Sequence, residues 1–136
     1  MTPVNVASLF EATEAPAPRR KGPTPEARVL KAVVRALERR GVLVERRSVS
    51  FDAQRRMSHG TPGEPDLRLS WRGRTAGVEV KAAGGRLRDT QTRWIERHGA
   101  DVPTWIVDSV TGAERAADAL TGPTWPVPGA DLRGLP

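Results

Sequence analysis

Apolar residues recur at helical spacing in three segments of the chain. The first segment begins at Thr24-Pro25-Glu26, where threonine suits the N-cap, proline the first turn and glutamate the positive end of the helix dipole. Gly41 is expected to end this helix after Arg40. Its apolar stripe is formed by Leu30, Val33, Val34 and Leu37. The pattern therefore predicts helices over residues 24–40, 87–98 and 109–120.

Alternation of apolar and polar residues with period two predicts strands elsewhere. Residues 67–71 and 74–80 flank the dipeptide Arg72-Gly73 and are expected to form a hairpin. A further strand is predicted before the hairpin at 42–51, followed by a loop rich in glycine and proline at 52–65, and another at 104–108. This order of elements predicts an α/β fold with a mixed central sheet flanked by helices.

The two ends of the chain differ in composition from its middle. Residues 1–23 are rich in alanine and proline, with a small apolar patch, and are expected to form a flexible arm. Residues 121–136 contain too many prolines for regular structure. The folded domain is therefore expected to span residues 24–120.

The chain of 136 residues is basic, with 22 lysines and arginines against 16 acidic residues and a net charge of +6. All but three of the basic residues are arginine, which binds phosphate groups in a bidentate manner. The charge therefore favours a polyanionic partner such as nucleic acid. A basic surface that serves only solubility would have the same composition, so charge alone leaves both alternatives open.

The composition also limits the chemistry. The absence of cysteine excludes disulfides, thiol nucleophiles and thiolate zinc sites, and His59 and His98 are the only histidines. Any metal is therefore expected to have oxygen ligands. Neither a signal peptide nor a membrane span is recognisable, so the sequence predicts a soluble, cytoplasmic protein with no membrane partner.

The predicted hairpin places two carboxylates on one face. With Arg72-Gly73 as the turn, the apolar residues of the two strands face each other, and Asp66 comes to lie opposite Glu79. Two opposed carboxylates about 5 Å apart repel each other by about 3 kcal/mol at an effective dielectric constant of about 20. A shared proton, the neighbouring Lys81 or a divalent cation could each offset this repulsion. The predicted partners along the hairpin are Trp71 with Arg74, Leu69 with Ala76, and Leu67 with Val78.

Two interpretations of this polar face are open. Converging carboxylates suit Mg²⁺ or Mn²⁺, whereas an edge strand with the same residues could be a solvated face with one salt bridge. Two more polar side chains favour a site. Glu26 is expected on the inward face at the start of the first helix, and Gln91 on the inward face of the second. Polar side chains on core-directed faces need partners, which the hairpin could supply.

At these residues the sequence resembles a known nuclease superfamily. GEPD at Gly63–Asp66, followed after a short hairpin by EVK at Glu79–Lys81, looks like the PD-(D/E)xK signature. Together with Glu26 and Gln91 it is similar to the VRR-NUC branch, found in phage proteins and in some cellular repair nucleases. The resemblance covers about residues 24–120 and implies a restriction-endonuclease-like αβββαβ core. The chain departs from that pattern in its short, proline-rich C-terminus.

The resemblance implies metal-dependent hydrolysis of phosphodiester bonds. Lys81 would orient or deprotonate the attacking water, and Gln91 would position Lys81 or the phosphate. The implied ligands of Mg²⁺ or Mn²⁺ are Asp66, Glu79, the carbonyl of Val80 and, directly or through water, Glu26.

The implied substrate is DNA, with branched structures such as the four-way junction expected, and stand-alone members of this branch act on them as homodimers. A phage-encoded enzyme of this kind would work in the cytoplasm of the bacterial host. Two other interpretations stay open: a restriction-like or nicking nuclease that works with a partner protein, and a non-catalytic DNA-binding module of the same fold. The expected contacts to the DNA backbone are Arg55, Arg56, Arg86, Arg93 and Arg97.

Overall fold

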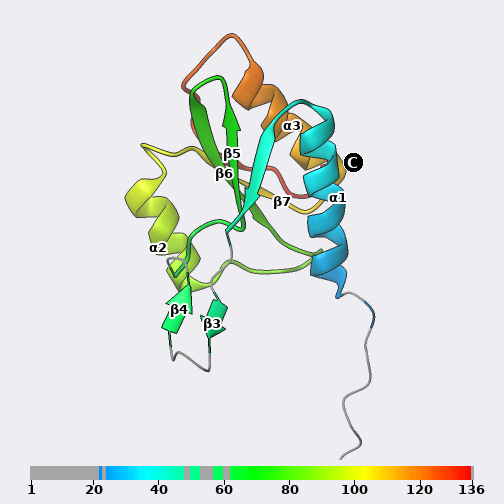
Figure 1. Cartoon of the computed structure of the whole chain (residues 1–136), viewed down its shortest axis with the longest axis vertical. Helices are drawn as coiled ribbons and strands as arrows, with labels where there is room; N and C mark the ends of the chain where they lie inside the picture. Colours follow the sequence, from blue (N-terminus) through cyan, green and yellow to red (C-terminus); the bar gives the residue numbers. More distant parts are fainter. Residues whose placement is uncertain (1–21, 23, 48–49, 53–56, 60–61, 136) are drawn as a thin grey trace, which may run out of the picture.

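A mixed sheet lies at the centre of the computed structural model, which describes residues 22, 24–47, 50–52, 57–59 and 62–135. Its elements are α1 (Pro25–Arg39), β2 (Leu43–Arg46), β3 (Ser50–Asp52), β4 (Met57–His59), β5 (Leu67–Trp71), β6 (Arg74–Val80), α2 (Asp89–His98), β7 (Thr104–Val107), α3 (Val110–Thr121) and β8 (Ala130–Asp131). The main sheet has the strand order β2-β5-β6-β7-β8, and β3 pairs with β4 separately. Helices α1 and α3 cover one face and α2 lies on the other (Figure 1). The predicted α/β fold is confirmed.

Side-chain caps begin two of the helices. The hydroxyl oxygen of Thr24 accepts a hydrogen bond from the amide of Ala27 at 3.1 Å, as expected for the start of α1. Ser109 does the same for Gly112 at the start of α3, also at 3.1 Å. These local contacts explain why both helix starts could be predicted from the sequence.

The hairpin of β5 and β6 has the predicted register. Leu69 lies opposite Ala76 and Leu67 opposite Val78, and these residues pack with α1 and α3 in the core. The turn holds Arg72 at φ 47° and Gly73 at φ 80°, the conformation that follows the twist of the two strands. Because side chains alternate between faces, Glu79 of β6 points away from this core and toward α2, where it bonds Gln91.

The predicted strand at 42–51 is wrong, because the chain changes sheets within it. Strand β2 pairs with β5, whereas β3 pairs with β4. Strand β5 begins at Leu67 and is preceded by Pro65, which has no N–H with which to extend the ladder. Beyond β2, the described residues continue the pairing with one backbone hydrogen bond, from the amide of Arg47 to the carbonyl of Asp66 at 2.6 Å. The predicted loop at 52–65 accordingly contains β4.

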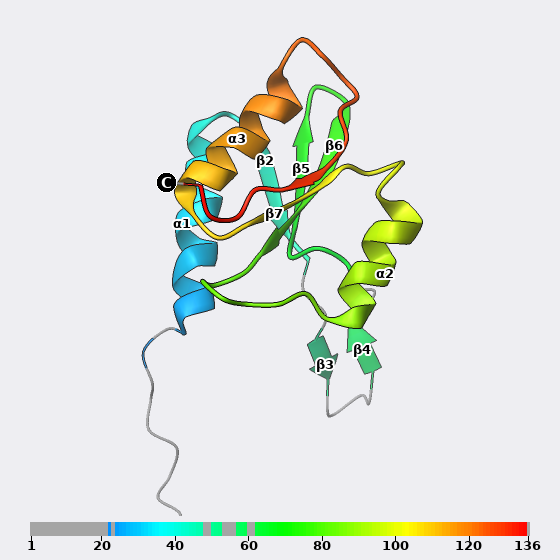
Figure 2. The ribbon, with the colours of Figure 1, turned by 180° about the vertical axis from the view of Figure 1, so that it is seen from behind.

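The prediction that the C-terminal residues lack regular structure is also wrong. The prolines at 123, 126 and 128 all precede Ala130, so the residues from Ala130 to Leu132 keep their amides for pairing. Strand β8 runs parallel to β7, and the amide of Leu132 donates to the carbonyl of Ile106 at 2.8 Å. Figure 2 shows this segment, in red, crossing the sheet beside β7.

The core fills the space between the sheet and the pair α1–α3. It is made of aliphatic side chains and one tryptophan, Trp105, which is 2% exposed. In the part of the chain that the structure describes, no helix has the length and apolarity needed to span a membrane. The fully buried members with the largest side chains are Leu37, Leu67, Leu69, Leu120, Val33, Val78, Val80 and Val107.

Candidate active site

The polar face at the end of β6 is buried beneath α2. Glu79 is 2% exposed, Lys81 6% and Gln91, from the first turn of α2, 4%. Burying charged groups costs free energy unless they are paired and hydrogen-bonded. The structure therefore excludes the interpretation of these side chains as a solvated edge face.

The three buried side chains form one hydrogen-bonded triangle. Nζ of Lys81 lies 3.2 Å from Oε2 of Glu79 and donates to Oε1 of Gln91 at 3.0 Å. Nε2 of Gln91 donates to the same Oε2 of Glu79 at 2.7 Å. The backbone amide of Arg88 donates to Oε1 of Gln91 at 2.8 Å, which orients the glutamine amide. Each polar atom of Gln91 is thus engaged, and the ammonium group of Lys81 is held at one place.

The carboxylate of Asp66 lies beside this triangle. The ladder of β5 and β6 ends with Leu67 opposite Val78, and Asp66 and Glu79 are the next residues on each strand. Oδ2 of Asp66 accepts a hydrogen bond from the amide of Val80 at 3.0 Å. This bond fixes the half-buried Asp66 against the backbone of β6, next to Glu79.

The electrostatics of Glu79 reflect this crowding. Burial, followed by the negative charge of Asp66, raises the pKa of Glu79 to about 7, although Lys81 acts in the opposite direction. Only one carboxylate oxygen of Glu79 is used by the triangle. The other, Oε1, is buried and has no hydrogen-bond partner among the described residues. A buried oxygen left without a partner costs about 1–3 kcal/mol, so Oε1 is suited to accept a hydrogen bond or to bind a cation.

These donors fit a hard divalent cation. Asp66 and Glu79 provide two carboxylates, one of them with the free Oε1, and a cation would offset the repulsion that raises the pKa of Glu79. Oxygen ligands of this kind suit Mg²⁺ and Mn²⁺. Among the described residues no group of three or more His, Cys, Asp or Glu side chains could hold a metal ion. A cation here would therefore need backbone and solvent oxygens as well.

The GEPD segment sets the position of α2. Gly63 has φ +84°, and a Cβ atom added to it would lie 2.0 Å from the carbonyl oxygen of Thr90 in the first turn of α2. Only glycine permits this approach, so the segment and the helix lie in direct contact. Pro65 packs over Gly77 in a similar way, since a Cβ at Gly77 would lie 2.8 Å from the Pro65 ring. These contacts hold Gln91 above the end of β6.

Comparison with solved structures finds a chain described as "VRR_NUC domain". The two chains are 26% identical, with a TM-score of 0.53, and the match covers 70% of this chain and 96% of that chain. No family model and no curated protein matches the sequence. The solved structure agrees with the resemblance carried by GEPD, EVK and Gln91. The chain is similar in sequence and fold to a VRR-NUC domain. Its mixed sheet flanked by helices is the restriction-endonuclease-like α/β fold implied by that resemblance.

Four of the residues predicted for the site lie together: Asp66, Glu79, Lys81 and Gln91. Val80 belongs to the same group through its backbone. Glu26, by contrast, is exposed in the first turn of α1. The sequence pattern placed Glu26 on the inward face, but the first turn of α1 extends beyond the packed part of the helix, whose buried residues begin at Val33.

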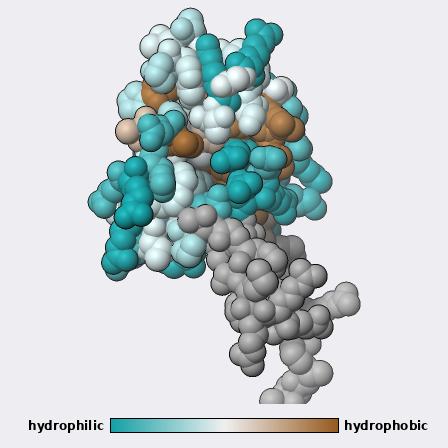
Figure 3. Space-filling view, turned by 60° about the vertical axis from the view of Figure 1, so that its left-hand side comes forward, coloured by the Kyte–Doolittle hydropathy of each residue, from teal (hydrophilic) through white to brown (hydrophobic). Residues whose placement is uncertain are grey.

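The arginines predicted to contact DNA fall into two groups. Arg86, Arg93 and Arg97 are exposed on α2 and the segment before it. Figure 3 shows mostly hydrophilic side chains with smaller hydrophobic areas on this side of the molecule. Arg93 and Arg97 line a shallow hollow of about 200 Å³. Arg55 and Arg56 lie outside the described residues.

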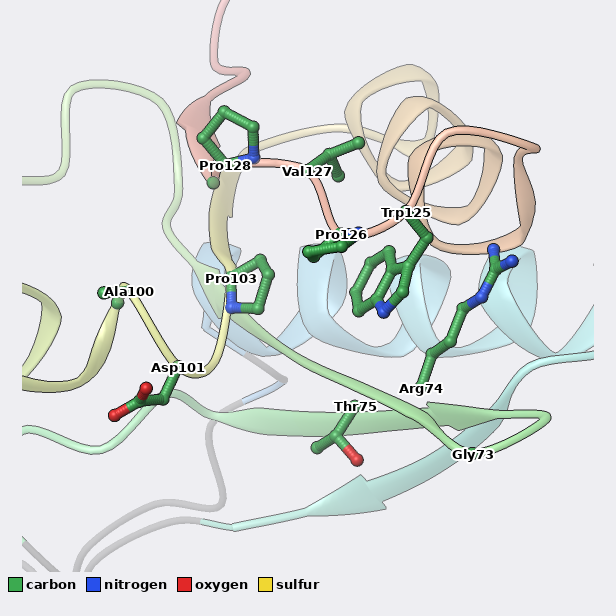
Figure 4. A pocket seen from close by; sticks show the side chains of 12 residues that line it. Gly73, Arg74, Thr75, Ala100, Asp101, Pro103, Trp125, Pro126, Val127 and Pro128 are labelled. Atoms are coloured by element: carbon green, nitrogen blue, oxygen red, sulfur yellow. The ribbon is translucent and has the colours of Figure 1, made fainter.

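A larger hollow, of about 560 Å³, lies at the opposite end of the hairpin from Asp66 (Figure 4). The indole of Trp125 and several prolines form its wall. Arg74 donates from this wall to the carbonyls of Leu120 and Gly122 at 2.8 and 2.7 Å, so its guanidinium satisfies the C-terminal end of α3. This hollow is therefore separate from the candidate active site.

Two contributors to the site were missed in the sequence. The backbone amide of Arg88 orients Gln91, and a backbone donor has no residue-specific signature; only the spacing typical of a capping box could have indicated it. Arg133 donates to the carbonyl of Gly85, in the loop that follows Lys81, across 48 positions of sequence. A contact over that separation leaves no pattern that periodicity can detect.

Proposed function

We propose that this protein is a nuclease that hydrolyses phosphodiester bonds of DNA with Mg²⁺ or Mn²⁺. The observation that carries the proposal is the buried triangle of Glu79, Lys81 and Gln91 beside Asp66, with Oε1 of Glu79 left without a partner among the described residues. A binding module gains nothing from two carboxylates crowded beside phosphate groups. A hydrolase uses such carboxylates to hold a cation.

The ligands would be Asp66, Glu79 and the carbonyl of Val80, with Glu26 contributing through water. When bound, a divalent cation neutralises charge on the phosphoryl group and increases the acidity of bound water. Glu79 would bind the cation as a carboxylate. Because the pKa of Glu79 is raised, the cation would compete with a proton for this group. The free Oε1 is the oxygen of Glu79 that has no competing hydrogen bond among the described residues.

Lys81 would then act on the water or on the phosphate. Its Nζ is already held by Glu79 and Gln91, which leaves a remaining N–H to donate to a non-bridging phosphate oxygen or to hold the attacking water. Water adds to phosphorus and loses a proton to solvent, the bond from phosphorus to the leaving oxygen breaks, and the leaving oxygen takes a proton from solvent. Gln91 keeps the ammonium group aimed at the reacting atoms, which lowers the entropic cost of the step.

The DNA backbone would lie across α2, where Arg93 and Arg97 share one hollow, with Arg86 on the approach and Arg55 and Arg56 as further contacts. The preference for branched DNA such as a four-way junction, and a homodimer that would match its symmetry, rest on the family resemblance. A restriction-like or nicking role with a partner protein is the alternative within nucleases, and a panel of substrates separates the two.

The test is cleavage of linear, single-stranded, nicked and four-way-junction DNA in Mg²⁺, in Mn²⁺ and in EDTA. Lys81→Ala and Asp66→Ala should abolish cleavage and leave DNA binding largely intact, because the exposed arginines are unchanged. Lys31→Ala is the matched control, since Lys31 is exposed on α1, and it should cut like the wild type. Undiminished cleavage by Lys81→Ala contradicts the site. Binding without cleavage under every condition favours the non-catalytic module.

A further inference from the structure

The C-terminal residues 130–135, here called the C-terminal strap, are tied to the sheet at several points. Strand β8 pairs with β7, and the amide of Leu132 donates to the carbonyl of Ile106 at 2.8 Å. The amide of Gly134 donates to the carboxylate of Asp108, which follows β7, at 3.1 Å. Figure 2 shows the strap ending next to the first turn of α3. Its course is thus fixed by hydrogen bonds on both sides of Arg133.

Arg133 is held in the strap by its own neighbour. Nη2 and Nε donate to the carboxylate of Asp131 at 2.8 and 3.0 Å, a bidentate pair. The pair lowers the pKa of Asp131, so both groups are charged at neutral pH. With its guanidinium fixed in this way, Arg133 donates from Nη1 to the carbonyl of Gly85 at 2.7 Å. The strap therefore reaches the loop between β6 and α2.

Gly85 in turn lies close to the side chain of Lys81. The amide of Gly85 closes a tight turn onto the carbonyl of Ala82 at 2.9 Å. A Cβ atom added to Gly85 would lie 3.3 Å from Cβ and 3.5 Å from Cδ of Lys81. The turn thus forms a wall along the methylene chain of Lys81, and a shift of Gly85 would open space for other conformers of that side chain.

We propose that Arg133 is a positioning residue of the nuclease site, which acts through Gly85 to confine Lys81 to the triangle with Glu79 and Gln91. This inference rests on the proposed function for its effect on cleavage, and on the hydrogen bonds of the strap for its effect on Lys81. It gives the C-terminal strap, which lies outside the segment that resembles the family, a part in the reaction. Arg133 itself does not touch the reacting atoms.

The test compares Arg133→Ala, Arg133→Lys and the control Arg115→Ala, whose arginine is exposed on α3. In Arg133→Ala we expect kcat about 10- to 100-fold lower, the range for residues that orient an active-site group, with KM for DNA nearly unchanged. Arg133→Lys keeps a donor and a charge for Asp131 and should recover part of kcat. Thermal melting shows that each variant is folded at the assay temperature.

A second readout does not depend on cleavage. The side-chain amide of Gln91 bonds both Glu79 and Lys81, so its NMR resonances report on the triangle in the metal-free protein. They should shift or broaden in Arg133→Ala and stay in place in Arg115→Ala. If the wild type cuts no DNA, the proposed function fails, while the Gln91 resonances still decide whether Arg133 positions Lys81. The inference is overturned if the Gln91 resonances are unchanged in a folded Arg133→Ala protein. It is also overturned if kcat falls as far in Arg133→Lys as in Arg133→Ala.

Discussion

Replacing Asp66 with asparagine should make the metal-free protein more stable while it removes the activity. Asparagine keeps an oxygen that can accept the hydrogen bond from the amide of Val80 but removes the charge that faces Glu79. Glu79 stays paired with Lys81, so the change eliminates the repulsion between carboxylates without leaving a buried charge alone. Active-site residues commonly reduce stability in this way.

The magnitude follows from the pKa of Glu79. A rise from 4.5 to about 7 corresponds to a cost of at most about 3 kcal/mol for ionising this group in the folded protein. Because the folded pKa lies above the unfolded one, the favourable contribution is complete below about pH 4.5 and is lost as the pH rises through about 7. Burial is the larger cause and Asp66 the second. The share removed by Asp66→Asn should therefore be about 1–2 kcal/mol.

Urea unfolding in EDTA measures this share. At about pH 8, where Glu79 is ionised, Asp66→Asn should be the more stable protein by that amount. At about pH 5, where Glu79 is protonated, the two proteins should differ little. Saturating Mn²⁺ should reverse the order at the higher pH, since the wild type gains about 2.7 kcal/mol at a hundred times the Kd and the variant gains much less.

Two results would refute this reasoning. Equal destabilisation by Asp66→Asn at both pH values would mean that the carboxylates do not repel each other and that Asp66 serves only the backbone of β6. A metal response that Asp66→Asn keeps in full would mean that the cation does not bind between Asp66 and Glu79. Asp101→Asn, at an exposed position, is the control for the loss of one negative charge.

Two further changes test the parts that hold the site, and a third tests the distant hollow at Arg74. Gly63→Ala should lower both kcat and Tm, because the added Cβ would lie 2.0 Å from a carbonyl oxygen of α2. The control Gly73→Ala, at a glycine with positive φ and open space around it, should lower the free energy of unfolding by only about 1 kcal/mol. Equal effects of the two variants in melting and cleavage assays would exclude the contact. Gln91→Leu keeps the side-chain volume but removes the hydrogen bonds that link the charges of Glu79 and Lys81. The rate of single-turnover cleavage should therefore fall by about 10- to 100-fold with DNA affinity unchanged. Full activity of this variant would show that Gln91 is not part of the site. Arg74→Met loses two hydrogen bonds to the end of α3. This change should lower the free energy of unfolding in urea by about 1–3 kcal/mol without affecting cleavage. A loss of activity would connect the distant hollow to the reaction.

Local features of the fold could be predicted from the sequence because each depends on residues close together in the chain. Thr24 caps α1 from three positions away, and the turn at Arg72-Gly73 determines the register of the hairpin. Since side chains alternate along a strand, that register alone places Asp66, Glu79 and Lys81 on one face. The strand at 42–51 was predicted wrongly because its end depends on where β5 begins, which no local pattern shows.

Which residues share a face, and which chemistry they could support, follows from the amino-acid sequence alone, because secondary structure has a short repeat. The burial of this face, in contrast, is a result of tertiary packing. Helix α2 covers this face, and Glu79, Lys81 and Gln91 form a buried triangle there. The burial also raises the pKa of Glu79. Tertiary structure also left Glu26 exposed and brought Arg133 to Gly85. Burial and contacts between distant residues depend on the packing of whole elements, and periodicity carries no information about them.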